Sequence, residues 1–249
     1  MRPDQLPLLA RLRSNVLLAP PFFLATAVFG SLALAASLFD KHGRLQHRIA
    51  RVWARTSVFL SGARLQVIGL EQIPTETAVF ASNHTSYMDT PVVFASLPFQ
   101  FRILAKKELW TLPFIGWYLD HSGQIPIDTQ NPRTTLSSFA AGVRTLREGL
   151  NVFVFPEGAR TPDGCLKPFL NGAAFLALRA QVPLVPIVLI GVRDLLPMHT
   201  QHFYPSPEGI PLKLVFGKAL STTGRSPRES EALTEELRQA IANLIEEYG

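Results

Sequence analysis

Short apolar runs alternate with stretches of helical periodicity over most of this chain. The runs hold mainly β-branched, leucine and aromatic residues, and most of them are continuously apolar rather than alternating with polar positions. Such runs are typical of strands in a sheet that is covered on both faces. The predicted strands are Arg64–Leu70, Ala78–Ser82, Arg102–Ala105, Gly123–Ile127, Val152–Phe155, Val185–Ile190 and Leu212–Phe216.

Apolar residues recur at helical spacing between and after these runs. One set lies within residues 136–146 and another within residues 233–245 near the C-terminus, after a polar loop at Ser221–Ser230. Strands that alternate with helices indicate an α/β fold. We therefore expect a mixed, largely parallel sheet that is flanked by helices.

The N-terminal part has a different pattern. Val16–Phe39 contains no charged residue and is long enough to cross a bilayer core. Three interpretations are open: a transmembrane span, a cleaved signal peptide preceded by Arg11 and Arg13, or a segment that enters the membrane and returns. Pro20 and Pro21 make the start of the run a poor uninterrupted helix.

Residues 44–60 favour the third interpretation. Arginine and lysine residues flank the apolar run on both sides, and the positive-inside rule would keep both flanks on the cytoplasmic side. An apolar stripe and an arginine stripe lie side by side on the predicted helix, as in helices at a membrane interface. The apolar stripe is Leu45, Ile49, Val52, Trp53 and Leu60, and the arginines are Arg44, Arg48, Arg51 and Arg55. The alternative is an amphipathic helix packed on a soluble core.

These patterns divide the chain into an anchoring segment, residues 1–62, and a globular domain, residues 63–249. The anchor is expected to be a membrane-associated helical hairpin on the cytoplasmic face of a cell inner membrane, monotopic or with a single span.

Composition agrees with a membrane location. Hydrophobic residues make up 47% of the 249 residues and charged residues only 17%. The net charge of +5 is uneven, because residues 1–64 carry +7 and the remainder carries −2. A basic apolar end suits an anionic membrane surface, whereas a slightly acidic body argues against a nucleic acid partner. The single cysteine, Cys165, permits no internal disulfide and is expected to be a packed residue rather than a nucleophile.

Candidate chemistry begins at His84 and Asp89, directly after a predicted strand. An imidazole can accept the proton of a hydroxyl while a carboxylate orients the ring. Five positions apart on one helix, the two side chains would diverge. Thr90 and Pro91 are a plausible N-cap and first helical residue, so a turn before them can fold the carboxylate back onto the imidazole. The alternative is a histidine that merely caps a strand end.

Two further segments could bind an anion. The sequence Phe155-Pro156-Glu157-Gly158-Ala159-Arg160 presents an arginine after a strand and a Pro-Glu-Gly turn, and arginine matches phosphate with a planar fork of donors. Lys106 and Lys107 follow another strand. The alternatives are an ordinary turn with a surface arginine and a solvated helix start.

Taken in order, these segments resemble the 1-acylglycerol-3-phosphate acyltransferase family of glycerolipid synthesis. The resemblance covers about residues 64–220 and is specific as an ordered set. It rests on Asn-His-x4-Asp, Ala-Lys-Lys-Glu-Leu, Gly-x3-Ile-Asp, Phe-Pro-Glu-Gly-x-Arg and Val-Pro-Ile-Val.

The resemblance implies that residues 63–249 form an acyltransferase domain that transfers an acyl group from acyl-CoA or acyl carrier protein to a lysophospholipid. It makes His84 the general base and Asp89 its orienting group. Lys106, Glu157, Gly158 and Arg160 would bind the acceptor, with Arg160 as the phosphate ligand. Neither a metal nor another cofactor is implied. Gly123, Ile127 and Asp128 match the second motif, and Pro186 matches the fourth.

Two departures leave the acceptor open. Thr129 and Asn171 stand where the family often carries arginine and lysine, so two positive charges are missing. Another lysolipid, such as lyso-ornithine lipid, is therefore an alternative acceptor to 1-acylglycerol-3-phosphate.

Other functional classes have weaker signals. A serine hydrolase would carry a Gly-x-Ser-x-Gly elbow, which this sequence lacks. His199 and His202 could ligate a metal, but no further ligands cluster beside them. A non-enzymatic membrane lipid-binding protein is the remaining alternative.

Overall fold

The computed structural model describes residues 12–40, 42–112, 115–128, 131–161, 163–196, 203 and 211–249. These residues contain a seven-stranded sheet in the order β1-β7-β6-β2-β5-β3-β4. Neighbouring strands are parallel except β6 and β7, which are antiparallel. The strands are β1 (Leu65–Ile68), β2 (Val79–Ser82), β3 (Phe101–Lys106), β4 (Ile125–Ile127), β5 (Asn151–Val154), β6 (Leu184–Ile190) and β7 (Leu212–Phe216).

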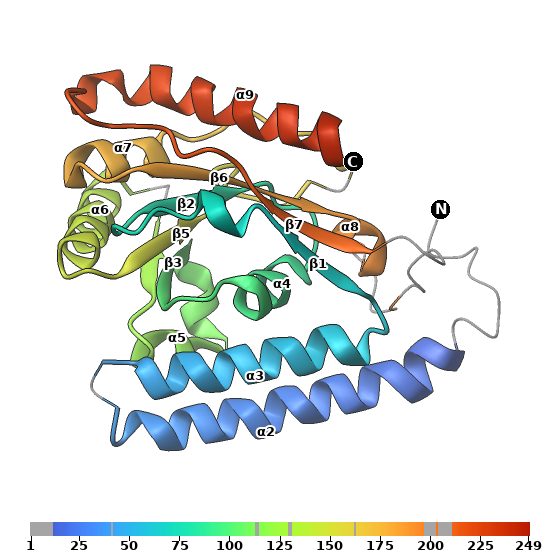
Figure 1. Ribbon diagram of the computed structural model, residues 1–249. Coiled ribbons are helices and arrows are strands. Elements are labelled where there is room, and N and C mark those ends of the chain that lie inside the picture. The colour runs from blue at the N-terminus through green and yellow to red at the C-terminus, as the bar shows by residue number, and fades with distance from the viewer. Residues whose placement is uncertain are drawn as a thin grey trace.

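Helices cover both faces of this sheet, so the predicted α/β fold is confirmed (Figure 1). All seven predicted strands and both predicted helices of the body are present, with small shifts at their ends. The helices are η2 (Arg13–Leu18), α2 (Ala19–Ser37), α3 (Arg44–Leu60), η3 (Leu70–Gln72), α4 (Asp89–Ser96), η4 (Lys107–Thr111), α5 (Ile115–His121), α6 (Pro132–Arg147), α7 (Gly172–Ala180), α8 (Val192–Leu195), η5 (Pro227–Glu229) and α9 (Ser230–Tyr248).

Successive residues of the central strands enter different hydrophobic cores. In β2, Phe80 packs into the core under α3 and α4, while Val79 and Ala81 pack into the core under α6, α7 and α9. Both residue sets are buried, which is why the strand sequences are continuously apolar instead of alternating.

The N-terminal helices form a hairpin along one side of the molecule, where α2 and α3 lie side by side (Figure 1). Asp40 lies before the N-cap residue Gly43 and satisfies the first turn of α3, because its Oδ2 accepts the N–H groups of Leu45 at 2.5 Å and Gln46 at 3.0 Å. The Trp53 indole N–H donates to Thr26 Oγ1 at 3.0 Å and joins the two helices. Among the described residues, one helix, Arg13–Ser37, is long and apolar enough to cross a membrane.

Helix α3 has the predicted bounds, but its two faces differ from the predicted arrangement. Small residues, Ala50, Ala54 and Val58, pack into the core beneath the sheet. The larger apolar residues Val52 and Phe59 point outward and are 49% and 80% exposed. The helix therefore packs on the body, as the alternative interpretation expected, and it also presents an exposed apolar surface on its other side. The predicted boundary at residue 62 falls between α3 and β1.

The start of α4 differs from the prediction. The helix begins at Asp89, with Met88 as the N-cap residue, so Thr90 and Pro91 lie inside its first turn. The Asp89 N–H bonds back to the Ser86 carbonyl at 3.4 Å, which continues the preceding turn into the helix. Proline is tolerated at this place because the first helical N–H groups have no partner within the helix.

His47 is a buried histidine on α3, between the rings of Phe94 and Phe101. Its Nε2 donates to the Phe99 carbonyl at 3.1 Å. Burial lowers the pKa of His47 to about 4, from an ordinary value of 6.5. The neutral ring is therefore favoured in the folded state.

This shift predicts a stability loss in acid. A histidine whose folded pKa is depressed stabilises the protein fully above pH 6.5, and that contribution disappears as the pH falls to about 4, by up to about 3 kcal/mol. The free energy of unfolding, measured with urea in non-ionic micelles, should fall less between pH 6.5 and pH 4 for His47→Phe than for the wild type. The control, His121→Phe at an exposed position, should follow the wild type. Parallel curves for His47→Phe and the wild type would contradict the assignment.

Candidate active site

The site begins where β2 ends, at Asn83. The Asn83 side chain takes the place of a further backbone pair with β6: its Oδ1 accepts the Leu189 N–H at 2.8 Å, and its amide donates to the Leu189 carbonyl at 3.0 Å. The chain can therefore leave the sheet at this point without stranding buried polar groups. These two bonds fix Asn83 and so fix the backbone position from which His84, the next residue, begins the turn.

Asp89 closes the turn that follows. Its buried Oδ2 accepts three N–H groups: His84 Nδ1 at 2.7 Å, Thr85 N at 2.6 Å and Ser86 N at 2.8 Å. The predicted pairing of His84 with Asp89 is confirmed. Because Nδ1 donates to the carboxylate, the neutral ring keeps its free lone pair on Nε2, where it can accept a proton.

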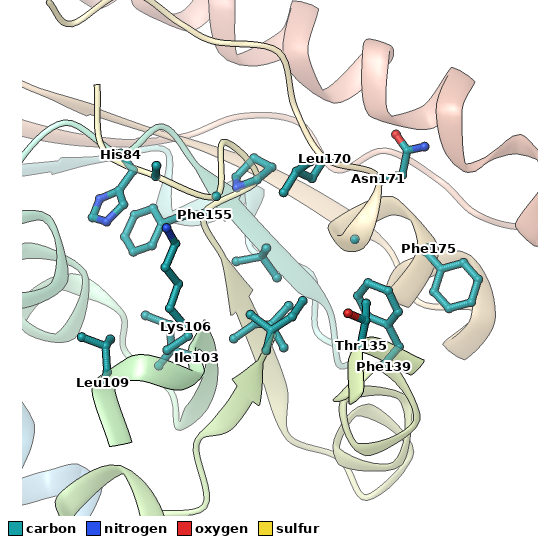
Figure 2. Close-up of a pocket in the computed structure, with 18 of the residues that line it drawn as sticks. His84, Ile103, Lys106, Leu109, Thr135, Phe139, Phe155, Leu170, Asn171 and Phe175 are labelled. Carbon is teal, nitrogen blue, oxygen red and sulfur yellow. The ribbon is translucent and has the colours of Figure 1, made fainter. Parts of the chain in front are cut away.

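Phe155 packs against one face of the His84 ring. The two rings stack with centroids 3.9 Å apart and planes 14° from parallel (Figure 2). Packing on an apolar ring limits rotation of the imidazole, and the Asp89 bond fixes its remaining orientation. Phe155 belongs to a motif noted in the sequence, but no local pattern predicted that its ring would stack on His84.

The loop after β5 forms hydrogen bonds with the backbone of His84. Glu157 Oε1 accepts the His84 N–H at 2.8 Å, and Glu157 Oε2 accepts the Lys167 N–H at 3.1 Å. Thr161 N and Oγ1 donate to the His84 carbonyl at 2.9 and 3.3 Å. Burial raises the pKa of the Glu157 carboxyl, and the two amide donors oppose that rise. Both carboxylate oxygens are thus occupied by backbone, and this geometry favours a bracing role for Glu157.

A cavity of about 620 Å³ opens beside His84. It runs over the ends of the central strands toward α6 and α7, and Figure 2 shows Phe139 and Phe175 at the side far from His84. Most of its lining is apolar. Lys106 reaches toward His84, whereas the polar residues Thr135 and Asn171 lie on the side of Phe139 and Phe175 (Figure 2). Lys106, Gly158 and Arg160 line it, whereas Asp89 and Glu157 are not among the lining residues. An anionic head group could lie beside His84 and Lys106, and an apolar chain could lie toward Phe139 and Phe175.

Arg160 has an unusual neighbour. Its guanidinium carbon lies 4.0 Å from the centroid of the Tyr87 ring. Tyr87 comes from the turn between His84 and Asp89, so it joins the two predicted motifs directly. Its role could not be predicted from the sequence, because the contact joins residues far apart in the chain.

The remaining predicted residues are distributed differently. Ile127 and Asn171 line the cavity, while Pro186 lies within β6. Gly123 has a positive φ of 71°, and a side chain there would meet Arg102 Nε at 3.2 Å, so this glycine makes room for a buried arginine rather than for a ligand. Thr129, His199 and His202 lie outside the described residues. Within the described ranges, no group of three or more His, Cys, Asp or Glu side chains is arranged to hold a metal ion.

Substitution of Glu157 distinguishes a structural role for this residue from direct binding of the substrate. Glu157→Ala would leave two N–H groups without their acceptor, which costs about 1–3 kcal/mol each where they stay buried. We expect a lower melting temperature and a lower kcat. Arg160→Ala is the control and should leave the melting temperature unchanged. A raised acceptor KM with wild-type stability in Glu157→Ala would instead favour direct contact with the substrate.

Comparisons with known proteins agree with this geometry. The family described as Acyltransferase matches residues 64–190. A 1-acyl-sn-glycerol-3-phosphate acyltransferase of Pseudomonas aeruginosa is 30% identical over 206 residues, covering 81% of this chain and 78% of that protein. A protein of the same name from Chlamydomonas reinhardtii is 30% identical over 96% of this chain and 71% of its own length.

The match to the chloroplast relatives is shorter. The BAT2 protein of Brassica napus is 34% identical over 64% of this chain, and the match spans about half of its length, 47%. The crystal structure of the 1-acyl-sn-glycerophosphate acyltransferase PlsC from Thermotoga maritima has the same fold, with a TM-score of 0.78 over 96% of this chain and 97% of that chain, at 22% identity. The chain therefore belongs to the Acyltransferase family, and it is similar in sequence to proteins named 1-acyl-sn-glycerol-3-phosphate acyltransferases.

Proposed function

We propose that this protein transfers a fatty acyl group from acyl-CoA or acyl carrier protein to the free hydroxyl of 1-acylglycerol-3-phosphate, giving phosphatidic acid. The observation that supports it most is the His84–Asp89 pair at the mouth of a mainly apolar cavity that also holds Arg160 and Lys106. The printed names of the relatives support the same acceptor.

In this proposal His84 is the base. Its Nε2 takes the proton of the acceptor hydroxyl while the hydroxyl oxygen attacks the thioester carbonyl carbon. The tetrahedral intermediate then collapses, the carbon–sulfur bond breaks, and the leaving thiolate takes the proton from the imidazolium. Asp89 stabilises the imidazolium and keeps the ring aimed. The reaction needs no acyl-enzyme, metal or other cofactor.

Arg160 and Lys106 would bind the acceptor phosphate. Both line the cavity near His84, and both are cationic at neutral pH. Asn171 also lines the cavity but contributes no charge. A lysolipid with a weaker anionic head group, such as lyso-ornithine lipid, therefore stays the alternative acceptor.

The hairpin would hold the domain on the membrane. Val28 on α2 and Phe59 on α3 are 47% and 80% exposed. Other large apolar residues of both helices are also exposed. Exposed apolar helix faces beside arginines suit a bilayer interface with anionic lipids. We propose a monotopic attachment at the cytoplasmic face of the inner membrane, because basic residues flank α2 on both sides.

The base assignment predicts a large loss in His84→Ala. Acyl transfer from acyl-CoA to lysophosphatidate should fall at least about 100-fold, because removal of a general base costs about that factor or more. The exposed residue His121 provides the control, and His121→Ala should keep the wild-type rate. A wild-type rate in His84→Ala would refute the mechanism. No transfer by the wild type with either donor would favour a lipid-binding protein.

An acceptor panel tests the substrate. With one acyl donor at saturation, kcat/KM should be higher for lysophosphatidate than for lyso-ornithine lipid, because two cations face the head group. The reverse order would reassign the acceptor and leave the chemistry of His84 in place.

Membrane attachment can be tested without removing the hairpin, whose deletion would also remove Ala50, Ala54 and Val58 from the core. We expect Val28→Asp/Phe59→Asp to bind vesicles of phosphatidylethanolamine and phosphatidylglycerol at least about tenfold more weakly, since each change exposes a charge where apolar area would be buried. The control is Leu136→Asp on α6, at a residue that is 65% exposed. Flotation of the double variant with wild-type yield would contradict the attachment.

A further inference from the structure

Tyr87 is the outward side chain of a turn whose other members face inward. Thr85, Ser86, Met88 and Asp89 are buried, whereas Tyr87 is 47% exposed. Burial of its ring in the core therefore does not explain an aromatic residue here. The contact that the ring does make is with Arg160, whose guanidinium carbon lies 4.0 Å from the ring centroid.

The charge of Arg160 is not neutralised by the protein around it. Within the part of the chain that the structure describes, no carboxylate forms an ion pair with Arg160, and its Nε is buried without a hydrogen-bond partner. Of the two nearest carboxylates in sequence, Glu157 accepts two backbone N–H groups and Asp163 accepts the Cys165 N–H. Arg160 thus retains its positive charge and its donors for a ligand.

An aromatic ring is a suitable support for such an arginine. The negative face of the ring attracts the cation but leaves its charge in place, whereas a carboxylate would neutralise it. The guanidinium donors lie at the edge of the group, in its plane, so contact with its face leaves them free for phosphate oxygens. Contact with the ring also restricts a long flexible side chain, which lowers the entropy lost when a ligand binds.

We infer that Tyr87 is a positioning residue that holds Arg160 for the anionic head group of the acceptor. The turn between His84 and Asp89 then has two functions: its ends form the base and its orienting carboxylate, and its middle supports the phosphate ligand. The inference rests on the proposed function, because it requires that Arg160 binds the acceptor. The ring face carries the interaction, so the Tyr87 hydroxyl is dispensable.

Steady-state kinetics of a mutant cycle test this inference. The acceptor KM and kcat are measured with lysophosphatidate in mixed micelles at saturating acyl-CoA, for the wild type, Tyr87→Phe, Tyr87→Leu, Arg160→Ala and the double variant Tyr87→Leu/Arg160→Ala. Tyr248→Leu, at the far C-terminal end, is the matched control and should behave as the wild type.

We expect Tyr87→Phe to match the wild type within about twofold. Tyr87→Leu should raise the acceptor KM about two- to fivefold with little change in kcat, which is the size expected for a partly exposed cation–π contact. In the Arg160→Ala background, Tyr87→Leu should have no further effect, since the partner of the ring is already absent.

Each other result has a distinct meaning. An unchanged KM in Tyr87→Leu together with a raised KM in Arg160→Ala would overturn the role of Tyr87 and leave the proposed phosphate site in place. Additive effects in the double variant would show that Tyr87 acts independently of Arg160 and would also overturn it. An unchanged acceptor KM in Arg160→Ala would reject the phosphate site itself.

Discussion

The site depends on one buried oxygen atom, Asp89 Oδ2, which accepts three N–H groups from a six-residue turn. Two of these donors are backbone amides and the third is His84 Nδ1. The amides hold the carboxylate in place through this one oxygen, and the carboxylate in turn fixes the tautomer and direction of the imidazole. Because Asp89 is also the first residue of α4, the position of that helix sets the position of the base.

Other interactions attach this turn to elements that are distant in sequence. Asn83 fastens its start to β6, Glu157 and Thr161 fasten the His84 backbone to the loop after β5, and the Ser86 hydroxyl donates to the Leu196 carbonyl at 2.8 Å. The hairpin is joined to the same body, since Arg102 Nη2 donates to the His42 carbonyl in the α2–α3 connection at 2.7 Å. The α2–α3 hairpin and the turn that carries the base are thus attached to the same sheet.

The sequence patterns predicted the strands well, because both faces of the sheet are buried and the apolar runs are continuous. They also predicted that His84 and Asp89 meet, since a strand end followed by a helix start leaves few paths for the turn. The faces of α3 could not be predicted in the same way. Its alanines pack closely against the body while its larger residues face outward, and hydrophobic periodicity alone does not distinguish a core from a membrane.

Roles that depend on contacts between distant segments were the least predictable. Phe155 stacks on His84, and Tyr87 supports Arg160, but neither pairing has a local pattern. Glu157 illustrates the converse. Its motif indicated a ligand for the acceptor, whereas the geometry gives both of its oxygens to backbone amides and so favours a structural role.

The most direct test of direct acyl transfer to the lipid is mass spectrometry of the intact protein after rapid mixing with acyl-CoA in the absence of acceptor. A histidine that acts only as a base predicts an unmodified protein mass and no burst of free CoA. A stoichiometric acyl adduct on the protein, formed with a matching burst of CoA, would contradict direct transfer to the lipid hydroxyl.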